Sequence, residues 1–165
     1  MKNALCVGAT IVLLWANPDI RAMQDQDTAA IDAFIARQAR RERGEEYKDA
    51  RKIAAGDLNH DGVADTAVLY TIEGQGGSNN YVQYLAVFVR GKSAGAAVAN
   101  VAVGGKSYRS VELTSVSDNK IHLDTLDYTP KDATCCPSKK GTTDYALVGG
   151  VLREQKRPRA QSRRN

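Results

Sequence analysis

Short β-prone runs separated by turn residues fill the chain from Lys52 to Leu152 and limit the folds open to it. Runs of this length, bounded by Gly, Asn, Asp or Ser, are typical of strands and hairpins. The run 81–89 is almost wholly apolar or aromatic, which predicts a central strand buried on both faces. Asp118-Asn119 and Gly149-Gly150 suit tight hairpin turns. Further strands are expected over residues 64–72, 98–103, 111–116, 121–126, 145–148 and 151–152.

One helix is expected before these strands. It is capped by Asp27 or Thr28, runs to about Arg41, and has Gly44 as its stop. Its apolar face would carry Ile31, Phe34, Ile35 and Gln38, and its charged face Arg37, Arg40, Arg41 and Glu42. The predicted fold class is α+β, mainly β: an N-terminal helix and charged connector (residues 23–52), then a β-rich calcium-binding domain (53–152) built as an antiparallel sheet or small sandwich.

The first 22 residues have the order of a secretory signal peptide. Lys2 precedes an apolar run over residues 4–16, which is shorter than a membrane-spanning helix, and Pro18 follows it. Cleavage is expected after Ala22, with Ala16 as the competing site, and a buried N-terminal helix is the alternative interpretation. Cys6 lies near the start of this run, whereas a lipid-anchored cysteine would follow it. The predicted location is therefore periplasmic or secreted.

The net charge of +4 comes from the end of the chain. Residues 153–165 contain six basic residues and one acid, whereas residues 53–152 contain eight basic and ten acidic residues. The tail has no aromatic residue and no apolar periodicity, so it is predicted to be disordered, with solvation or weak attraction to anionic lipid or an acidic partner as its role. The basic balance therefore does not predict nucleic-acid binding by the folded body.

One motif suggests a metal. Residues 56–65 read G-D-L-N-H-D-G-V-A-D, and a tightly curled loop of this kind can point several oxygens at Ca²⁺. The predicted ligands are the side chains of Asp57, Asn59, Asp61 and Asp65 and the carbonyl of Val63. His60 falls at a non-ligand position and should point outward. The alternative is an Asx-rich turn without metal, because Asp, Asn and Gly dominate turns in any case.

This loop resembles the calcium loops of FG-GAP repeats in integrin-type propellers, and less closely those of dockerins and EF-hands. The EF-hand would require Glu at its twelfth position, which is Val68 here, and a strand-like run follows the loop in place of a helix. The loop occurs in a single copy, so a multi-bladed propeller is not expected. The resemblance implies Ca²⁺ as a structural cofactor.

Two adjacent cysteines, Cys135 and Cys136, lie in a polar stretch. Neighbouring Cα atoms are about 3.8 Å apart, below the usual disulfide range, so the pair is either a strained vicinal disulfide or a free or partner-linked pair, with a metal or catalytic thiol as a third interpretation. A cysteine hydrolase could combine either thiol with His122 and Asp124, although no local signature supports it.

Two functions follow from these features. The first is a secreted or periplasmic, calcium-binding, non-enzymatic β domain for protein interaction, with the 74–80 and 129–142 loops as contact surfaces. Its layout resembles periplasmic immunity proteins that inhibit cell-wall hydrolases, which implies a protein partner, with such a hydrolase as a candidate. No nucleic acid partner and no transmembrane span are expected. The alternative is a small secreted hydrolase using the Cys135-Cys136 loop.

Overall fold

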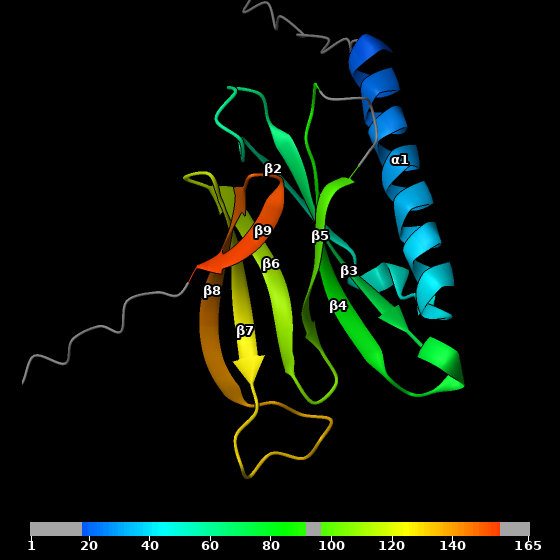
Figure 1. Cartoon of the computed structure of the whole chain (residues 1–165), viewed down its shortest axis with the longest axis vertical. Coiled ribbons are helices and arrows are strands. Elements are labelled where there is room, and N and C mark those ends of the chain that lie inside the picture. The colour runs from blue at the N-terminus through cyan, green and yellow to red at the C-terminus, as the bar shows by residue number, and fades with distance from the viewer. Residues whose placement is uncertain (1–17, 92–96, 156–165) are drawn as a thin grey trace, which may run out of the picture.

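A computed structural model of the chain describes residues 18–91 and 97–155. One N-terminal helix precedes a nine-stranded antiparallel sheet, which confirms the predicted fold class (Figure 1). The elements are α1 (Pro18–Glu42), β1 (Glu45–Glu46), β2 (Lys52–Gly56), β3 (Asp65–Glu73), β4 (Tyr81–Phe88), β5 (Ala97–Gly105), β6 (Arg109–Ser117), β7 (Lys120–Asp127), β8 (Lys139–Val148) and β9 (Val151–Gln155), with short 3-10 turns at Lys48–Ala50 and Gln75–Gly77.

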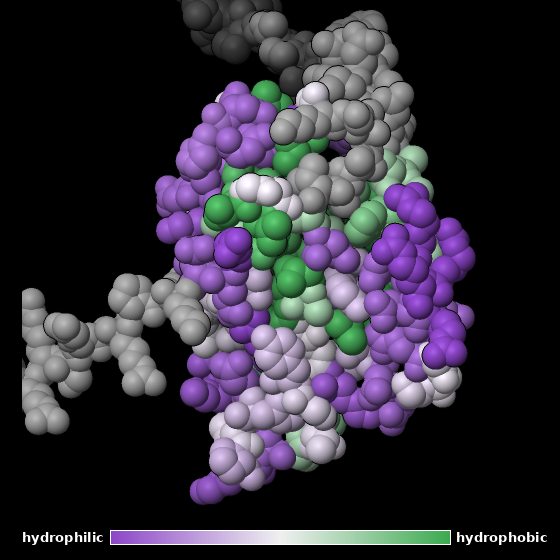
Figure 2. Space-filling view, in the orientation of Figure 1, coloured by the Kyte–Doolittle hydropathy of each residue, from purple (hydrophilic) through white to green (hydrophobic). Residues whose placement is uncertain are grey.

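The sheet folds back on itself. Its strand order is β1-β3-β4-β5-β6-β7-β8-β9, and β2 pairs with β3 beside β1. Contacts of β2 with β6 and of β5 with β9 bring the two halves of the sheet face to face. Helix α1 lies along the other side of β3 and β4, and the part of its outward surface that Figure 2 colours is hydrophilic (Figures 1 and 2). The result is three layers: the helix, the β3–β5 half and the β6–β9 half.

Two apolar cores separate these layers, because β3 and β4 are buried on both faces. The core between the sheet halves contains Leu58, Ala67, Leu69, Leu85, Val87, Val103, Leu113, Ile121, Leu123 and Leu152, among others. The core under α1 contains Ile31, Ile35, Ala39, Val68, Tyr70, Ile72, Tyr84, Ala86 and Phe88. Alternate side chains along β3 therefore serve different cores, as the two-residue period of a strand requires.

Helix α1 starts earlier than the sequence predicts. It begins at Pro18, whereas the prediction placed its cap at Asp27 or Thr28. Proline is tolerated in the first turn of a helix, because the N–H that it lacks would have no partner within the helix there. Ala22 lies within α1, and the competing cleavage site after Ala16 is outside the described residues, as is the basic tail beyond Gln155. Ile31 and Ile35 of the predicted apolar face are buried, and the partly buried Phe34 meets the rings of Tyr70 and Phe88 edge-on.

The charged connector is more structured than expected. It forms β1 and a 3-10 turn, and Arg51 fastens it to the helix. The Arg51 guanidinium donates to Asp32 on α1 at 2.6 Å and to Glu46 on β1 at 2.7 Å. Charges of both signs in a short segment predict that it is solvated. Here the charged side chains instead form ion pairs that join the connector to the helix.

The two halves of the sheet are joined by few backbone hydrogen bonds. The register between β5 and β6 in the described residues contains the single pair Gly105–Arg109. The Gln83 side chain on β4 takes over part of this pairing: its Nε2 donates to the Val111 carbonyl at 3.0 Å, and its Oε1 accepts from the Val111 N–H at 2.9 Å. Gly104 leaves room for it, since a Cβ there would lie 2.6 Å from Oε1 of Gln83.

A buried polar network lies between the sheet halves near β9. Arg109, with a side chain 9% exposed, donates to the Val103 carbonyl at 2.6 Å, the Tyr145 hydroxyl at 2.9 Å and the Glu154 carboxylate at 2.8 Å. Thr143 also donates to Glu154, at 2.8 Å. Every polar group of this cluster thus has a partner, which is the condition for burying a charge in a β core.

This network predicts a pH dependence. Burial raises the pKa of Glu154, but hydrogen bonds from Arg109 and Thr143 outweigh it and hold that pKa below its ordinary value of 4.5. The resulting stabilisation is complete above pH 4.5 and is lost as pH falls through the lower folded-state pKa. Thermal unfolding of wild type and Glu154→Gln between pH 3 and pH 6 should give a shallower acid slope in the variant. The slope will not vanish, because backbone amides also lower the pKa of Asp57 and Asp132. Equal slopes would contradict this assignment.

Candidate functional site

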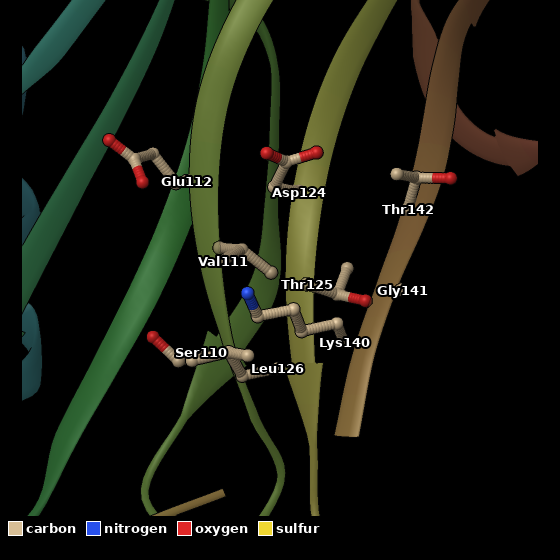
Figure 3. A pocket seen from close by; sticks show the side chains of 9 residues that line it. All are labelled: Ser110, Val111, Glu112, Asp124, Thr125, Leu126, Lys140, Gly141 and Thr142. Carbon is tan, nitrogen blue, oxygen red and sulfur yellow. The ribbon is translucent and has the colours of Figure 1, made fainter. Parts of the chain in front are cut away.

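An open groove of about 530 Å³ lies on the outer face of β6, β7 and β8. The strand register places its side chains in two rows. Ser110, Leu126 and Lys140 form one row, and Glu112, Asp124 and Thr142 form the next (Figure 3). Val111, Thr125 and Gly141 lie between these positions along the strands and complete the lining. Three neighbouring strands therefore present a polar surface with a defined spacing, whereas their opposite face is the apolar core.

The charged groups of this groove have no partner of their own. Glu112 and Asp124 are exposed and lie directly opposite each other on β6 and β7. Like charges in directly opposed positions destabilise a strand pair. Among the described residues, neither carboxylate, nor the Lys140 ammonium, makes a side-chain hydrogen bond or ion pair. The groove thus offers two unpaired carboxylates and, one row away, an unpaired ammonium.

His122 continues this face beyond Asp124. Its Nδ1 lies 2.8 Å from Asp144 Oδ1, and its Nε2 lies 3.0 Å from Ser117 Oγ and 3.3 Å from the Ser117 carbonyl oxygen. The ring therefore links β6, β7 and β8 at the end of the groove. The order Asp–His–Ser also occurs in hydrolases, which need oxyanion donors as well. In the turn between β6 and β7, the Asn119 side-chain amide donates to the Asp57 carbonyl at 2.8 Å, so it is already engaged with the acidic loop.

The cysteine hydrolase predicted from the sequence is not assembled. His122 contacts Asp144 and Ser117, while Asp124 lies one row away in the groove. Cys135 and Cys136 are joined to each other by a disulfide, so neither sulfur is a free thiol. Sequence reasoning did not identify Asp144 as the partner of His122. Only the register between β7 and β8 brings the two residues together, and residue types alone do not reveal that register.

The acidic loop is held together by its own hydrogen bonds. Asp57 accepts from the backbone N–H groups of Asn59, His60 and Gly62, and the Gly62 amide in particular lowers the pKa of Asp57. Asp61 accepts from the Val63 N–H at 2.8 Å and from the Asn59 side chain at 2.8 Å. His60 is exposed, as its non-ligand position implied. The loop is therefore a succession of Asx turns.

Asp65, the last predicted calcium ligand, serves the core of the fold. Its side chain is fully buried and accepts from the Leu58 N–H and the Arg90 N–H, both at 3.0 Å. The described residues contain no cluster of three or more His, Cys, Asp or Glu side chains placed to hold a metal. Calcium binding by Asp57, Asn59, Asp61, Val63 and Asp65 thus stays a prediction from the sequence, without support from this geometry.

The cysteine loop stands at one end of the groove. It joins β7 to β8, between the Leu126 and Lys140 positions of the first groove row. Asp132 organises it by accepting from the Thr129 N–H, the Ser138 N–H and the Ser138 hydroxyl. Hydrogen bonds from Thr129 and Ser138 lower the pKa of Asp132, which keeps this carboxylate charged. The loop is shorter than predicted, since β8 already begins at Lys139.

Comparison with known proteins corrects the predicted resemblance. The model of the LppP/LprE lipoprotein family matches residues 59–150, more than half of the chain. No curated protein and no solved structure matches. The similarity to FG-GAP calcium loops and to periplasmic immunity proteins was therefore wrong: the match runs through the acidic loop and on across the sheet to the last hairpin. Within the described part of the chain, no helix is long and apolar enough to cross a membrane. The chain belongs to the LppP/LprE lipoprotein family, and this membership implies an extracytoplasmic location in the cell envelope.

Proposed function

We propose that this protein is a non-enzymatic binding domain of the cell envelope, and that its groove on β6–β8 receives a basic side chain of a protein partner. The observation that carries the proposal is the directly opposed pair Glu112–Asp124, exposed in the groove and unpaired within the described residues. A guanidinium or ammonium placed between these carboxylates would remove their repulsion and form charge-assisted hydrogen bonds.

The size of the groove and its first row, which contains Ser110 and Lys140, support a side chain with its backbone rather than a bare ion. About 530 Å³ falls within the range of small-molecule sites, and a lone cation would fill little of it. Lys140 and Ser110 offer donors one row from the carboxylates. A basic residue could therefore place its cation on Glu112 and Asp124 and a carbonyl or carboxylate near Lys140.

An NMR titration of the full chain with Nα-acetyl-L-arginine methylamide tests this proposal. Amide shifts are expected at residues 110–112, 124–126 and 140–142, with weak affinity that falls as salt is added, because the contact is exposed. The double variant E112Q/D124N should lose at least about tenfold in affinity, which corresponds to the roughly 1.5–3 kcal/mol of hydrogen bonds to charged groups.

The chain offers a matched control. Glu45 and Glu73 also lie directly opposite each other, on β1 and β3, and they are far from the groove in the strand order. The variant E45Q/E73Q removes the same charge and the same kind of opposed pair, so it should bind the probe like wild type. Equal loss in both double variants, or shifts outside the groove, would contradict the proposed site.

A further inference from the structure

The disulfide between Cys135 and Cys136 cannot serve as a staple for the fold. A disulfide stabilises mainly by closing a loop in the unfolded chain, and its effect grows with the number of residues enclosed. These two cysteines are neighbours, with Cα atoms 3.8 Å apart, so the bond encloses no intervening residue. It connects no two elements of structure. Its contribution to the stability of the sheet is therefore expected to be close to zero.

Hydrogen bonds already hold the loop in place without the disulfide. The Asp132 carboxylate ties Thr129, at the start of the loop, to Ser138, at its end, with distances of 2.7–3.0 Å. The Tyr128 hydroxyl donates to the Thr134 carbonyl at 2.6 Å. Because the bonds from Asp132 to Ser138 join the two sides of the cysteine pair, the sulfur atoms can change their bonding while the loop keeps its course.

Both cysteines are exposed to solvent. Thiol–disulfide exchange needs access for an attacking thiolate, and exposed disulfides are commonly the labile, regulatory or catalytic ones. The separation of 3.8 Å also lies below the usual Cα range for disulfides, about 4.4–6.8 Å, and pairs outside that range are more readily reduced. An envelope location, where stable disulfides form, supplies the oxidised state.

We propose that Cys135–Cys136 is a thiol–disulfide exchange site for a dithiol oxidoreductase. A thiolate of the oxidoreductase attacks one sulfur of the pair, forms a mixed disulfide and releases the other cysteine as a thiolate, which takes up a proton. The second thiol of the oxidoreductase then attacks the mixed disulfide through its own thiolate. The products are Cys135 and Cys136 as thiols and an oxidised oxidoreductase, so two electrons and two protons pass to the pair. The reverse reaction reoxidises it.

The first experiment separates this site from a structural disulfide. Full-length protein carrying Cys6→Ser, so that alkylation counts the pair alone, is equilibrated with reduced and oxidised dithiothreitol and then alkylated for mass analysis. We expect the folded protein to be fully reduced by millimolar dithiothreitol, and C135S/C136S to melt within about 1 °C of the oxidised protein, because the bond encloses no loop. A pair that resists reduction, a pair already present as thiols after oxidation, or a loss of more than about 5 °C would overturn the proposal.

The second experiment detects the mixed disulfide. A purified thioredoxin-fold oxidoreductase whose second active-site cysteine is replaced with alanine cannot complete the exchange, so it should remain covalently attached to the oxidised protein. The complex should survive denaturing electrophoresis, disappear with dithiothreitol and fail to form with C135S/C136S. A variant with Ser138→Ala, which alters the loop but keeps both sulfurs, serves as the control and should still be trapped. Absence of the complex with oxidised wild type would refute the exchange site.

Discussion

Replacing Arg109 with methionine is expected to lower the free energy of unfolding by about 3 kcal/mol, the lower end of the range for removing one member of a buried ion pair. The guanidinium serves three acceptors at once: the Val103 carbonyl, the Tyr145 hydroxyl and the Glu154 carboxylate. Methionine has a similar volume but no donor, so the Val103 carbonyl and the partly exposed Glu154 carboxylate would lose charge-assisted bonds. The lower end applies because the Glu154 side chain is 38% exposed and can recover some hydration.

Urea unfolding of wild type and the variant measures this loss. Arg153→Met is the matched control, because Arg153 is exposed on the same strand as Glu154. Its effect should stay within about 0.5 kcal/mol, as for most surface substitutions. Arg109→Lys should recover only part of the stability, since an ammonium cannot present the planar fork that reaches all three acceptors. Equal losses at Arg109 and Arg153 would show that the buried network does not stabilise the sheet.

Replacing Asp65 with asparagine is expected to cost about 2–3 kcal/mol, because one of two buried backbone N–H groups would face an amide NH₂ in place of an oxygen. The carboxylate bonds Leu58 N–H with one oxygen and Arg90 N–H with the other. Rotating the amide satisfies either donor, never both. Asp65 thus joins the acidic loop to the end of β4, and the variant should loosen both segments.

The same variant tests the calcium prediction. Melting temperatures of wild type, Asp65→Asn and Asp61→Asn are compared in Ca²⁺ and in EGTA. If Asp65 acts through its two backbone amides, its substitution costs the same in both solutions. Asp61 is exposed and bonds within its own turn, so its substitution should cost little in EGTA. A wild-type stabilisation by Ca²⁺ that both variants abolish would instead establish the metal site and overturn the purely structural role of Asp65.

The parts of the fold predicted from sequence are those encoded locally. The turn at Asp118-Asn119 requires positive φ at both residues, which Asp and Asn tolerate, and it appears with φ of 50° and 57°. By contrast, the first half of β8, with sequence Lys-Lys-Gly-Thr-Thr-Asp, has the composition of a loop and was predicted as one. It is a strand because β7 pairs with it from Lys139 onward, whereas β9 pairs with β8 only from Asp144 onward. That information is not present within the segment.

The candidate site was harder to predict than the fold, because it depends on contacts between residues that are distant in the sequence. Asp57, Asn59 and Asp61 fit an Asx turn as well as a calcium loop, because both arrangements curl alternate oxygens inward. The buried amides that face Asp65 give this carboxylate a role in the fold, and Arg90, which supplies one of them, is 25 residues away. Likewise, the sequence predicts strands that contain Glu112 and Asp124, but only the register between β6 and β7 sets these two residues opposite each other.

The junction between β5 and β6 has a mechanical consequence. The register of the described residues gives this junction one backbone pair, and the Gln83 side chain and the Arg109–Val103 hydrogen bond add side-chain links across it. On one side lies the layer backed by α1, and on the other lies the layer that carries the groove and the cysteine loop. A pulling force transmitted from a bound partner would therefore meet few backbone hydrogen bonds at this junction, so the apolar core between the two layers supplies most of the resistance to their separation.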